Sequence, residues 1–161
     1  MDALDVALVT ALREQPRAGD LQLSRTLGVA RATVQSRLRR LEESGVITGY
    51  GPDIDLAAAG HPVLAFVTLE IAQGRLDAVT AELESLPNVL EAYVTSGQAD
   101  LVCKIAATSH EDLQAVLLHI SRSGSVERST SVIVLSEVVA PRVLPMLARD
   151  APPSPRAPRY R

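Results

Sequence analysis

The chain has 161 residues, of which 47% are hydrophobic, and a formal net charge of −3. This length allows one medium domain or two small ones, and the hydrophobic content is enough for packed cores. Aromatic residues make up only 2%, which argues against a binder of single-stranded nucleic acid. The single cysteine, Cys103, excludes an internal disulfide. Because no apolar run approaches the roughly 20 residues of a membrane span, and no signal-peptide pattern opens the chain, we expect a cytoplasmic protein without a membrane partner.

Charge is unevenly distributed along the chain. Residues 62–139 hold 4 basic and 10 acidic side chains, whereas residues 1–50 hold 7 arginines and 6 acids. Within the first block, residues 31–40 carry four arginines and no acid. Positive charge is therefore concentrated in one short stretch near the start of an otherwise acidic chain, as expected for a small nucleic-acid-binding region.

The first 50 residues show three helical patterns. Residues 3–13 place apolar side chains on one face, namely Leu4, Leu8, Ala11 and Leu12. A short helix over 21–27 is expected to begin after Asp20 as N-cap and to end at Gly28 in a left-handed conformation. A third helix, residues 31–44, carries the apolar stripe Val34, Leu38 and Leu41. Two helices joined by a tight glycine turn indicate a helix-turn-helix.

The outward side of the third helix has the chemistry of a DNA-reading face. Its predicted DNA-binding residues are Arg31, Ala32, Gln35, Ser36, Arg37, Arg39 and Arg40. Arginine binds guanine and glutamine binds adenine in a bidentate way, and small side chains let a helix approach the base edges. We expect Arg37 and Arg40, at the flanks, to contact phosphates. The alternative is a solvated basic helix face without a ligand.

A second domain is expected after a linker. Residues 46–50 favour a short strand, which would make the first domain a winged helix-turn-helix over 1–50, and residues 51–61 have linker composition. Residues 62–147 alternate β-branched and helical segments in the order βαββαβ, which predicts an α+β, ferredoxin-like domain. The strands are expected at 63–71, 89–96, 100–108 and 126–139, and the helices at 76–86 and 111–121, the second opened by Ser109 and Asp112. The proline-rich residues 148–161 are expected to be disordered.

Motifs in both halves resemble the Lrp/AsnC (feast/famine) family of transcription regulators over nearly all of residues 1–147. The resemblance lies in Leu4-Asp5, in 23–28, in 34–42 with its run Arg37-Leu38-Arg39-Arg40-Leu41-Glu42, in 45–47 and in Gly49-Tyr50. It implies a helix-turn-helix joined to a βαββαβ effector domain that dimerises through its sheet, the dimers often assembling into octamers. It therefore implies three partners: double-stranded DNA, an amino-acid-like effector and further copies of the chain.

A candidate effector site lies between the second and third strands of the second domain. The turn 96–100 offers backbone N–H groups to a carboxylate and Asp100 to an ammonium group, which suits an amino acid. We expect Gly97 to be able to adopt positive φ. The predicted effector-binding residues are Ser96, Gly97, Gln98, Asp100, Ser129 and Ser131, the serines by resemblance to family ligand contacts. Gln98 departs from the family's acidic loop, which disfavours a basic effector. The alternative is a plain β-turn with two solvated serines.

Other functions have weaker signals. The three histidines and Cys103 lack the spacing of a metal site, and no catalytic or phosphate-loop motif is present, so we expect neither enzyme activity nor a metal or cofactor. RNA recognition would need aromatic residues on the central strands, where only Phe66 is found. Two alternatives remain open: a DNA-architectural protein without an effector, and an amino-acid-binding regulatory subunit of a metabolic enzyme.

Overall fold

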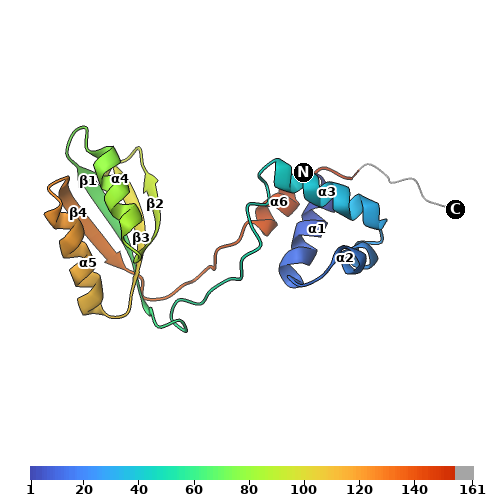
Figure 1. Ribbon diagram of the computed structural model, residues 1–161, viewed down its shortest axis with the longest axis horizontal. Helices are drawn as coiled ribbons and strands as arrows, with labels where there is room; N and C mark the ends of the chain where they lie inside the picture. Colours follow the sequence, from blue (N-terminus) through green and yellow to red (C-terminus); the bar gives the residue numbers. More distant parts are fainter. Residues whose placement is uncertain (155–161) are drawn as a thin grey trace. The chain divides into compact units, whose positions relative to one another are not determined.

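The computed structural model describes residues 1–154 (Figure 1). It divides into two compact units, one comprising Met1–Pro52 together with residues 139–154, the other comprising Asp53–Val138. Among the described residues, no helix combines the length and apolar character that crossing a membrane requires.

Three helices form the N-terminal unit: α1 (Ala3–Glu14), α2 (Asp20–Leu27) and α3 (Arg31–Glu43). The predicted apolar stripes meet in one core, whose buried members are Leu8, Ala11, Leu23, Val34 and Leu41. Gly28 ends α2 in the left-handed conformation, with φ 65°, as predicted. The helix-turn-helix thus follows from local sequence signals, namely the apolar periodicity of the helices and the glycine that ends α2.

Two local predictions in this unit are wrong. Asp20 does not cap α2; Gly19 is the N-cap and Asp20 is the first helical residue. Residues 46–50 form no strand, so the described chain shows no wing in this unit. Instead, the N–H groups of Val46 and Ile47 donate to the Leu41 carbonyl, at 2.9 and 3.1 Å, and close the end of α3. A strand exists only when a neighbouring strand accepts its hydrogen bonds, and none lies beside this segment.

The C-terminal segment folds onto the N-terminal unit rather than continuing the second domain. Helix α6 (Leu144–Asp150) contacts α1, and the Ala3 N–H donates to the Pro152 carbonyl at 2.9 Å. Residues 139–154 thus group with the N-terminal unit, whereas the effector domain was expected to extend to residue 147, and α6 continues to Asp150 although disorder was expected from residue 148. The rest of the predicted tail, 155–161, lies outside the described residues.

The second unit has the predicted α+β, βαββαβ order. Its elements are β1 (Val63–Ile71), α4 (Leu76–Ser85), β2 (Val89–Val94), β3 (Leu101–Ala107), α5 (His110–Arg122) and β4 (Val126–Ile133). The strands form one antiparallel sheet in the order β2-β3-β1-β4. Ser109 caps α5 through the Asp112 N–H, as predicted. Strand β4 stops well before the predicted residue 139, because its partner β1 begins at Val63 and Pro62 has no N–H to extend the pairing.

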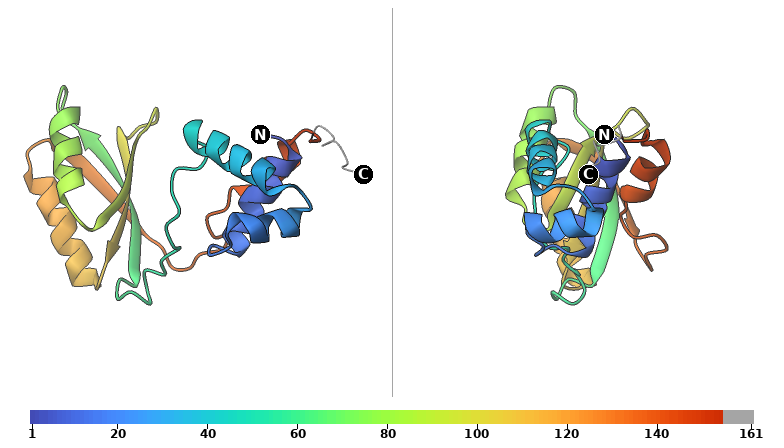
Figure 2. Two further views of the ribbon diagram at one scale, coloured as in Figure 1. Left: turned by 45° about the vertical axis from the view of Figure 1, so that its right-hand side comes forward. Right: turned by 90° about the vertical axis from the view of Figure 1, so that its right-hand side faces the viewer.

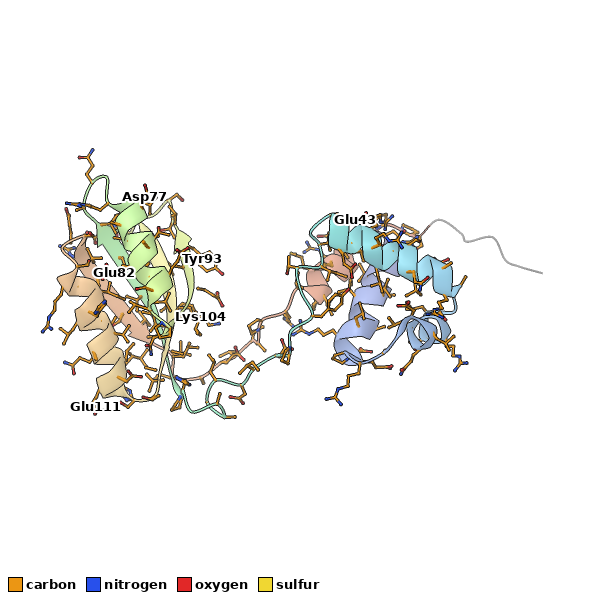
Figure 3. All side chains as sticks on the ribbon, in the orientation of Figure 1. Glu43, Asp77, Glu82, Tyr93, Lys104 and Glu111 are labelled. Carbon is orange, nitrogen blue, oxygen red and sulfur yellow. The ribbon has the colours of Figure 1, made fainter. Side chains whose placement is uncertain are left out.

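The two faces of this sheet differ. Helices α4 and α5 both cover one face (Figure 2). Side chains from β1 and β3 are buried on this face. The alternate residues of each strand point to the other face. There Phe66 is 45% exposed and pairs with the exposed Val132 of β4. Figure 3 labels Tyr93 and Lys104, which come from the neighbouring strands β2 and β3. The face without helices therefore carries apolar and charged side chains that a single chain does not cover.

Candidate DNA-binding and effector sites

Helix α3 presents a continuous polar face. Val34 and Leu41 are buried in the helical core. The predicted reading residues on the other side of the helix are exposed, namely Arg31, Ala32, Gln35, Ser36, Arg39 and Arg40. Arg39 makes no hydrogen bond or ion pair to any part of the chain from residue 1 to 154. The exposed face thus offers bidentate donors and small side chains where a base edge would lie.

The N-terminal end of α3 is tied to α2 through Asp20. The Gln35 Nε2 donates to the Asp20 Oδ2 at 2.8 Å, and the Arg31 Nε lies 3.9 Å from the same oxygen. The Asp20 side chain is 30% exposed and that of Arg31 62% exposed, so this contact lies at the protein surface. Two predicted reading residues are therefore held by one carboxylate.

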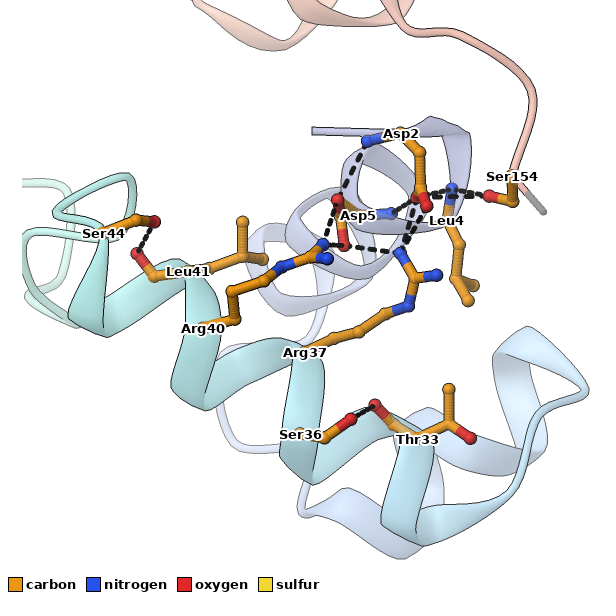
Figure 4. A network of polar contacts seen from close by, with 10 residues as sticks. All are labelled: Asp2, Leu4, Asp5, Thr33, Ser36, Arg37, Arg40, Leu41, Ser44 and Ser154. Atoms are coloured by element: carbon orange, nitrogen blue, oxygen red, sulfur yellow. Dashed lines mark hydrogen bonds and ion pairs between the residues drawn. The ribbon is translucent and has the colours of Figure 1, made fainter.

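Arg37 and Arg40 turn back toward α1 instead of projecting outward (Figure 4). The Arg37 Nη1 donates to both Asp2 carboxylate oxygens, at 2.6 and 2.7 Å, and to Asp5 at 2.8 Å. The Arg40 Nη2 donates to both Asp5 oxygens, at 2.7 and 2.6 Å. The Arg37 side chain is only 16% exposed and bound to two acids, an arrangement that favours a supporting role over the predicted phosphate contact. Arg40 remains largely exposed beyond its ion pair.

In the acid–arginine cluster of Asp2, Asp5, Arg37 and Arg40, the contacts between Asp2 and Arg37 favour the charged forms of both side chains. Burial disfavours the charged form of Asp2, but hydrogen bonds from Arg37, the Asp5 backbone and Ser154 outweigh it and lower the pKa of Asp2 to about 2. The hydrogen bond to Asp2 raises the pKa of Arg37 above its usual value. Asp5 is fully buried and also accepts the Asp2 N–H, which completes the capping box of α1.

Our sequence reasoning missed this cluster. Acids at a helix start are favourable by themselves, so Asp2 and Asp5 do not on their own indicate a partner. A signal was present, because the two acids and the two arginines Arg37 and Arg40 have the same three-residue spacing on their respective helices. Matching i, i+3 pairs of opposite charge on two helices that share a core can meet across it.

The C-terminal tail reaches the same cluster. The Ser154 Oγ donates to the Asp2 Oδ1 at 3.1 Å and accepts the Leu4 N–H at 2.6 Å. The Leu4 N–H also donates to the Asp2 Oδ1 at 3.0 Å, so this donor in the first turn of α1 is shared between two acceptors. A residue 150 positions away from α1 in sequence thus supports the acid that holds Arg37.

In the second unit, Asp100 ties the candidate effector loop to β1. The Asp100 N–H donates to the Leu69 carbonyl at 2.9 Å, and its Oδ2 accepts the Ile71 N–H at 2.8 Å. Gly97 does not adopt positive φ, contrary to expectation. Among residues 1–154, no acceptor bonds the N–H groups of 96–99. The loop therefore has free donors, while one Asp100 oxygen already serves the fold.

The two serines of the candidate site lie on the other side of β1. Ser129 pairs with Leu69 and Ser131 pairs with Val67, so both side chains share the helix-covered side of the sheet. Leu69 bonds Asp100 on one flank and faces Ser129 on the other, which separates these two residues by two strand spacings, about 9.5 Å. Asp100 and Ser129 thus occupy one end of the sheet, and Ser131 lies further along β4.

Cys103 is a packing residue. It is fully buried, and burial raises the pKa of its thiol. Within the part of the chain that the structure describes, no three side chains of metal-binding type come together.

Comparison with known proteins agrees with both halves of this architecture. Residues 1–42 match the family model of the AsnC-type helix-turn-helix domain, and residues 64–144 match that of the Lrp/AsnC ligand binding domain. The chain belongs to the Lrp/AsnC family. Members of this family are transcriptional regulators that bind DNA through the helix-turn-helix and carry an effector-binding domain.

Individual members of the Lrp/AsnC family align over most of their length. The HTH-type transcriptional regulator FL11 of Pyrococcus horikoshii is 33% identical over 135 residues, which cover 84% of this chain and 89% of FL11. The solved structure of Escherichia coli AsnC has a TM-score of 0.83 at 28% identity and covers 90% of this chain and 99% of AsnC. A regulator of Neisseria meningitidis solved in complex with L-Met shares the fold, with a TM-score of 0.80 at 20% identity over 87% of this chain and 93% of that one.

Proposed function

We propose that this regulator reads its operator with the exposed face of α3. Arg31, Gln35 and Arg39 would contact base edges in the major groove, with Ala32 and Ser36 permitting close approach and Arg40 contacting a phosphate. Arg37 keeps a supporting role through Asp2 and Asp5. The observation that carries the proposal is the exposed face of α3, whose residues 31–40 contribute arginines and no acid, above a buried apolar stripe.

We further propose that the chain is a homodimer that associates into a higher oligomer such as an octamer. The apolar residues Phe66, Tyr93 and Val132 on the uncovered sheet face are exposed in one chain, and a second copy is the simplest cover. Two linked helix-turn-helix units would then contact two half-sites, so the operator would be a pseudo-palindrome. A monomer in light scattering at micromolar concentration would contradict this.

The proposed effector is an amino acid bound at the loop 96–100. The unbonded N–H groups of Ser96, Gly97 and Gln98 support a carboxylate site, and the second Asp100 oxygen supports an ammonium site. Ser129 and Ser131 would contribute hydroxyl groups from β4. On this proposal the chain acts in the cytoplasm as a regulator and not as an enzyme. A DNA-architectural role without an effector is the second candidate, favoured by the structural hydrogen bond from Ile71 to Asp100.

A panel of amino acids tests the effector proposal directly. Operator DNA selected from a random pool is titrated by gel shift with and without each amino acid, and thermal shift measures binding in parallel. An effector must bind one assembly or DNA-binding state better than another, and it then changes operator affinity by a factor that is typically about 5 to 150. If no amino acid changes either measurement, the architectural alternative is correct.

Asp100→Asn locates the effector site. The amide oxygen can still accept the Ile71 N–H, so the loop should remain folded while the ammonium partner is lost. We expect the effector response to disappear and basal DNA affinity to stay nearly unchanged. A full wild-type response in this variant would place the site elsewhere, and loss of basal DNA binding would make Asp100 structural.

A further inference from the structure

Asp20 stands at the edge of the reading face without belonging to it. It is the first residue of α2, yet its carboxylate accepts Gln35 Nε2 of α3 at 2.8 Å. We propose that Asp20 is a positioning residue that determines base specificity by setting the orientation of the Gln35 amide. This inference rests on the reading face proposed above.

The orientation follows from hydrogen-bond chemistry. A carboxylate only accepts hydrogen bonds, whereas a glutamine amide has one accepting and one donating end. Asp20 therefore holds the Nε2 end of Gln35, and an amide turned by 180° would bring two oxygens together. The Gln35 Oε1 and its second N–H remain available as one acceptor and one donor. That pair matches the N6 donor and the N7 acceptor of adenine in the major groove.

Because Asp20 orients the Gln35 amide before DNA binds, the free Oε1 acceptor and N–H donor can select adenine more strictly. A free glutamine side chain loses rotamer freedom when it binds, and it can present either end of its amide to a base. With Asp20 in place, one arrangement is already formed. The contact to Asp20 also links α3 to α2. The orientation of the Gln35 amide is therefore fixed relative to both helices of the helix-turn-helix.

Asp20 also lies near Arg31, and its negative charge lowers the overall affinity for DNA. The Arg31 Nε lies 3.9 Å from the same carboxylate oxygen, which leaves its two terminal nitrogens for DNA. A negative charge at this place weakens attraction to phosphates, because nonspecific DNA binding is mainly electrostatic. Asp20 therefore raises specificity while it lowers general affinity.

Asp20→Asn separates this role from a structural one. The shape is kept, but an asparagine amide can either accept from or donate to Gln35, so neither orientation is enforced. We expect affinity for random duplex DNA to rise several-fold and the ratio of specific to nonspecific affinity to fall by roughly tenfold. In sequence selection on random DNA, the preference for one base should relax at the Gln35 position. Simple damage to the fold would instead lower both affinities.

Glu43→Gln is the matched control. Glu43 is an exposed acid at the C-terminal end of α3 (Figure 3), so its neutralisation changes the net charge by the same amount as Asp20→Asn. We expect this control to preserve the selected base pattern. If Glu43→Gln relaxes the pattern as strongly as Asp20→Asn, the effect is one of net charge, and the proposed role of Asp20 is overturned. Asp20→Ala provides a second test if the asparagine variant has lost stability in a thermal melt.

Gln35→Ala distinguishes failure of this inference from failure of the proposed reading face. If Gln35→Ala leaves the selected sequence unchanged, the reading face is assigned wrongly. If it changes the sequence but Asp20→Asn and Asp20→Ala do not, the face stands and the role of Asp20 is overturned. In the double variant Asp20→Asn/Gln35→Ala, the Asp20 change should add no further relaxation, since it acts through Gln35.

Discussion

Helix α3 pairs its basic side chains with acids in two different ways. Toward α1, Arg37 and Arg40 contact Asp5, whose side chain is fully buried. Toward α2, Arg31 lies at 3.9 Å from Asp20, and both side chains remain partly exposed. The same residue type therefore stabilises the domain at one place and stays available to a ligand at the other. Arg40 combines both properties, because it pairs with the buried Asp5 while its own side chain stays 58% exposed.

The largest expected effect comes from removal of Asp5, the buried acid of the acid–arginine cluster. Asp5→Ala leaves Arg40 without its acid and removes one acid from Arg37, and loss of one partner of a buried ion pair costs about 3–5 kcal/mol. We expect a loss of that order in the free energy of unfolding measured in urea, with DNA binding lost as the unit unfolds. Asp20→Asn should change the free energy of unfolding by less than about 0.5 kcal/mol. Equal losses would remove the distinction between the two acids.

The second-largest effect is expected in the pH dependence of stability, through Asp2 of the acid–arginine cluster. The pKa of Asp2 is lowered from 3.8 to about 2 in the folded chain, so its stabilising contribution is fully present above pH 4 and disappears as pH falls toward 2. The contribution is on the order of 2 kcal/mol. Urea unfolding midpoints between pH 5 and pH 2 should fall less steeply for Asp2→Asn than for the natural chain. Parallel curves for the two proteins would show that Asp2 is not coupled to folding.

Arg39→Ala and Arg37→Ala should differ in kind. Arg39 is exposed, so we expect its loss to weaken specific DNA binding by about 1–3 kcal/mol without changing the melting temperature. Arg37 is held by Asp2 and Asp5, so its loss should lower the melting temperature and leave the salt dependence of DNA binding unchanged. Gel shift and thermal melts measure both. Unchanged operator affinity for Arg39→Ala would disprove the assigned face.

The smallest expected effect concerns the tail. Ser154→Ala removes the hydrogen bonds to Asp2 and to the Leu4 N–H, and should cost about 0.5–1.5 kcal/mol of unfolding free energy. Ser136→Ala, at an exposed serine, is the control and should cost nothing measurable. A Ser154 variant as stable as this control would mean that the tail does not support α1.

The sequence by itself determined most of the elements and the polar face of α3. Apolar periodicity locates helices and strands, Gly28 marks the helix end, and Val34 and Leu41 indicate which side of α3 is buried. It also located the loop 96–100. These features are encoded within a few residues, so local physical chemistry is enough to recover them.

The tertiary structure alone decided which side chains meet. Periodicity shows that one side of α3 faces a neighbour, but not that Asp2 and Asp5 of α1, more than 30 positions away, bind Arg37 there. The same holds for the contact of α6 with α1, and for the absence of a strand at 46–50, where no partner strand lies alongside. An ion pair, a helix contact and a strand each need two segments, and their pairing is set by packing of the whole unit, which no short stretch of sequence contains.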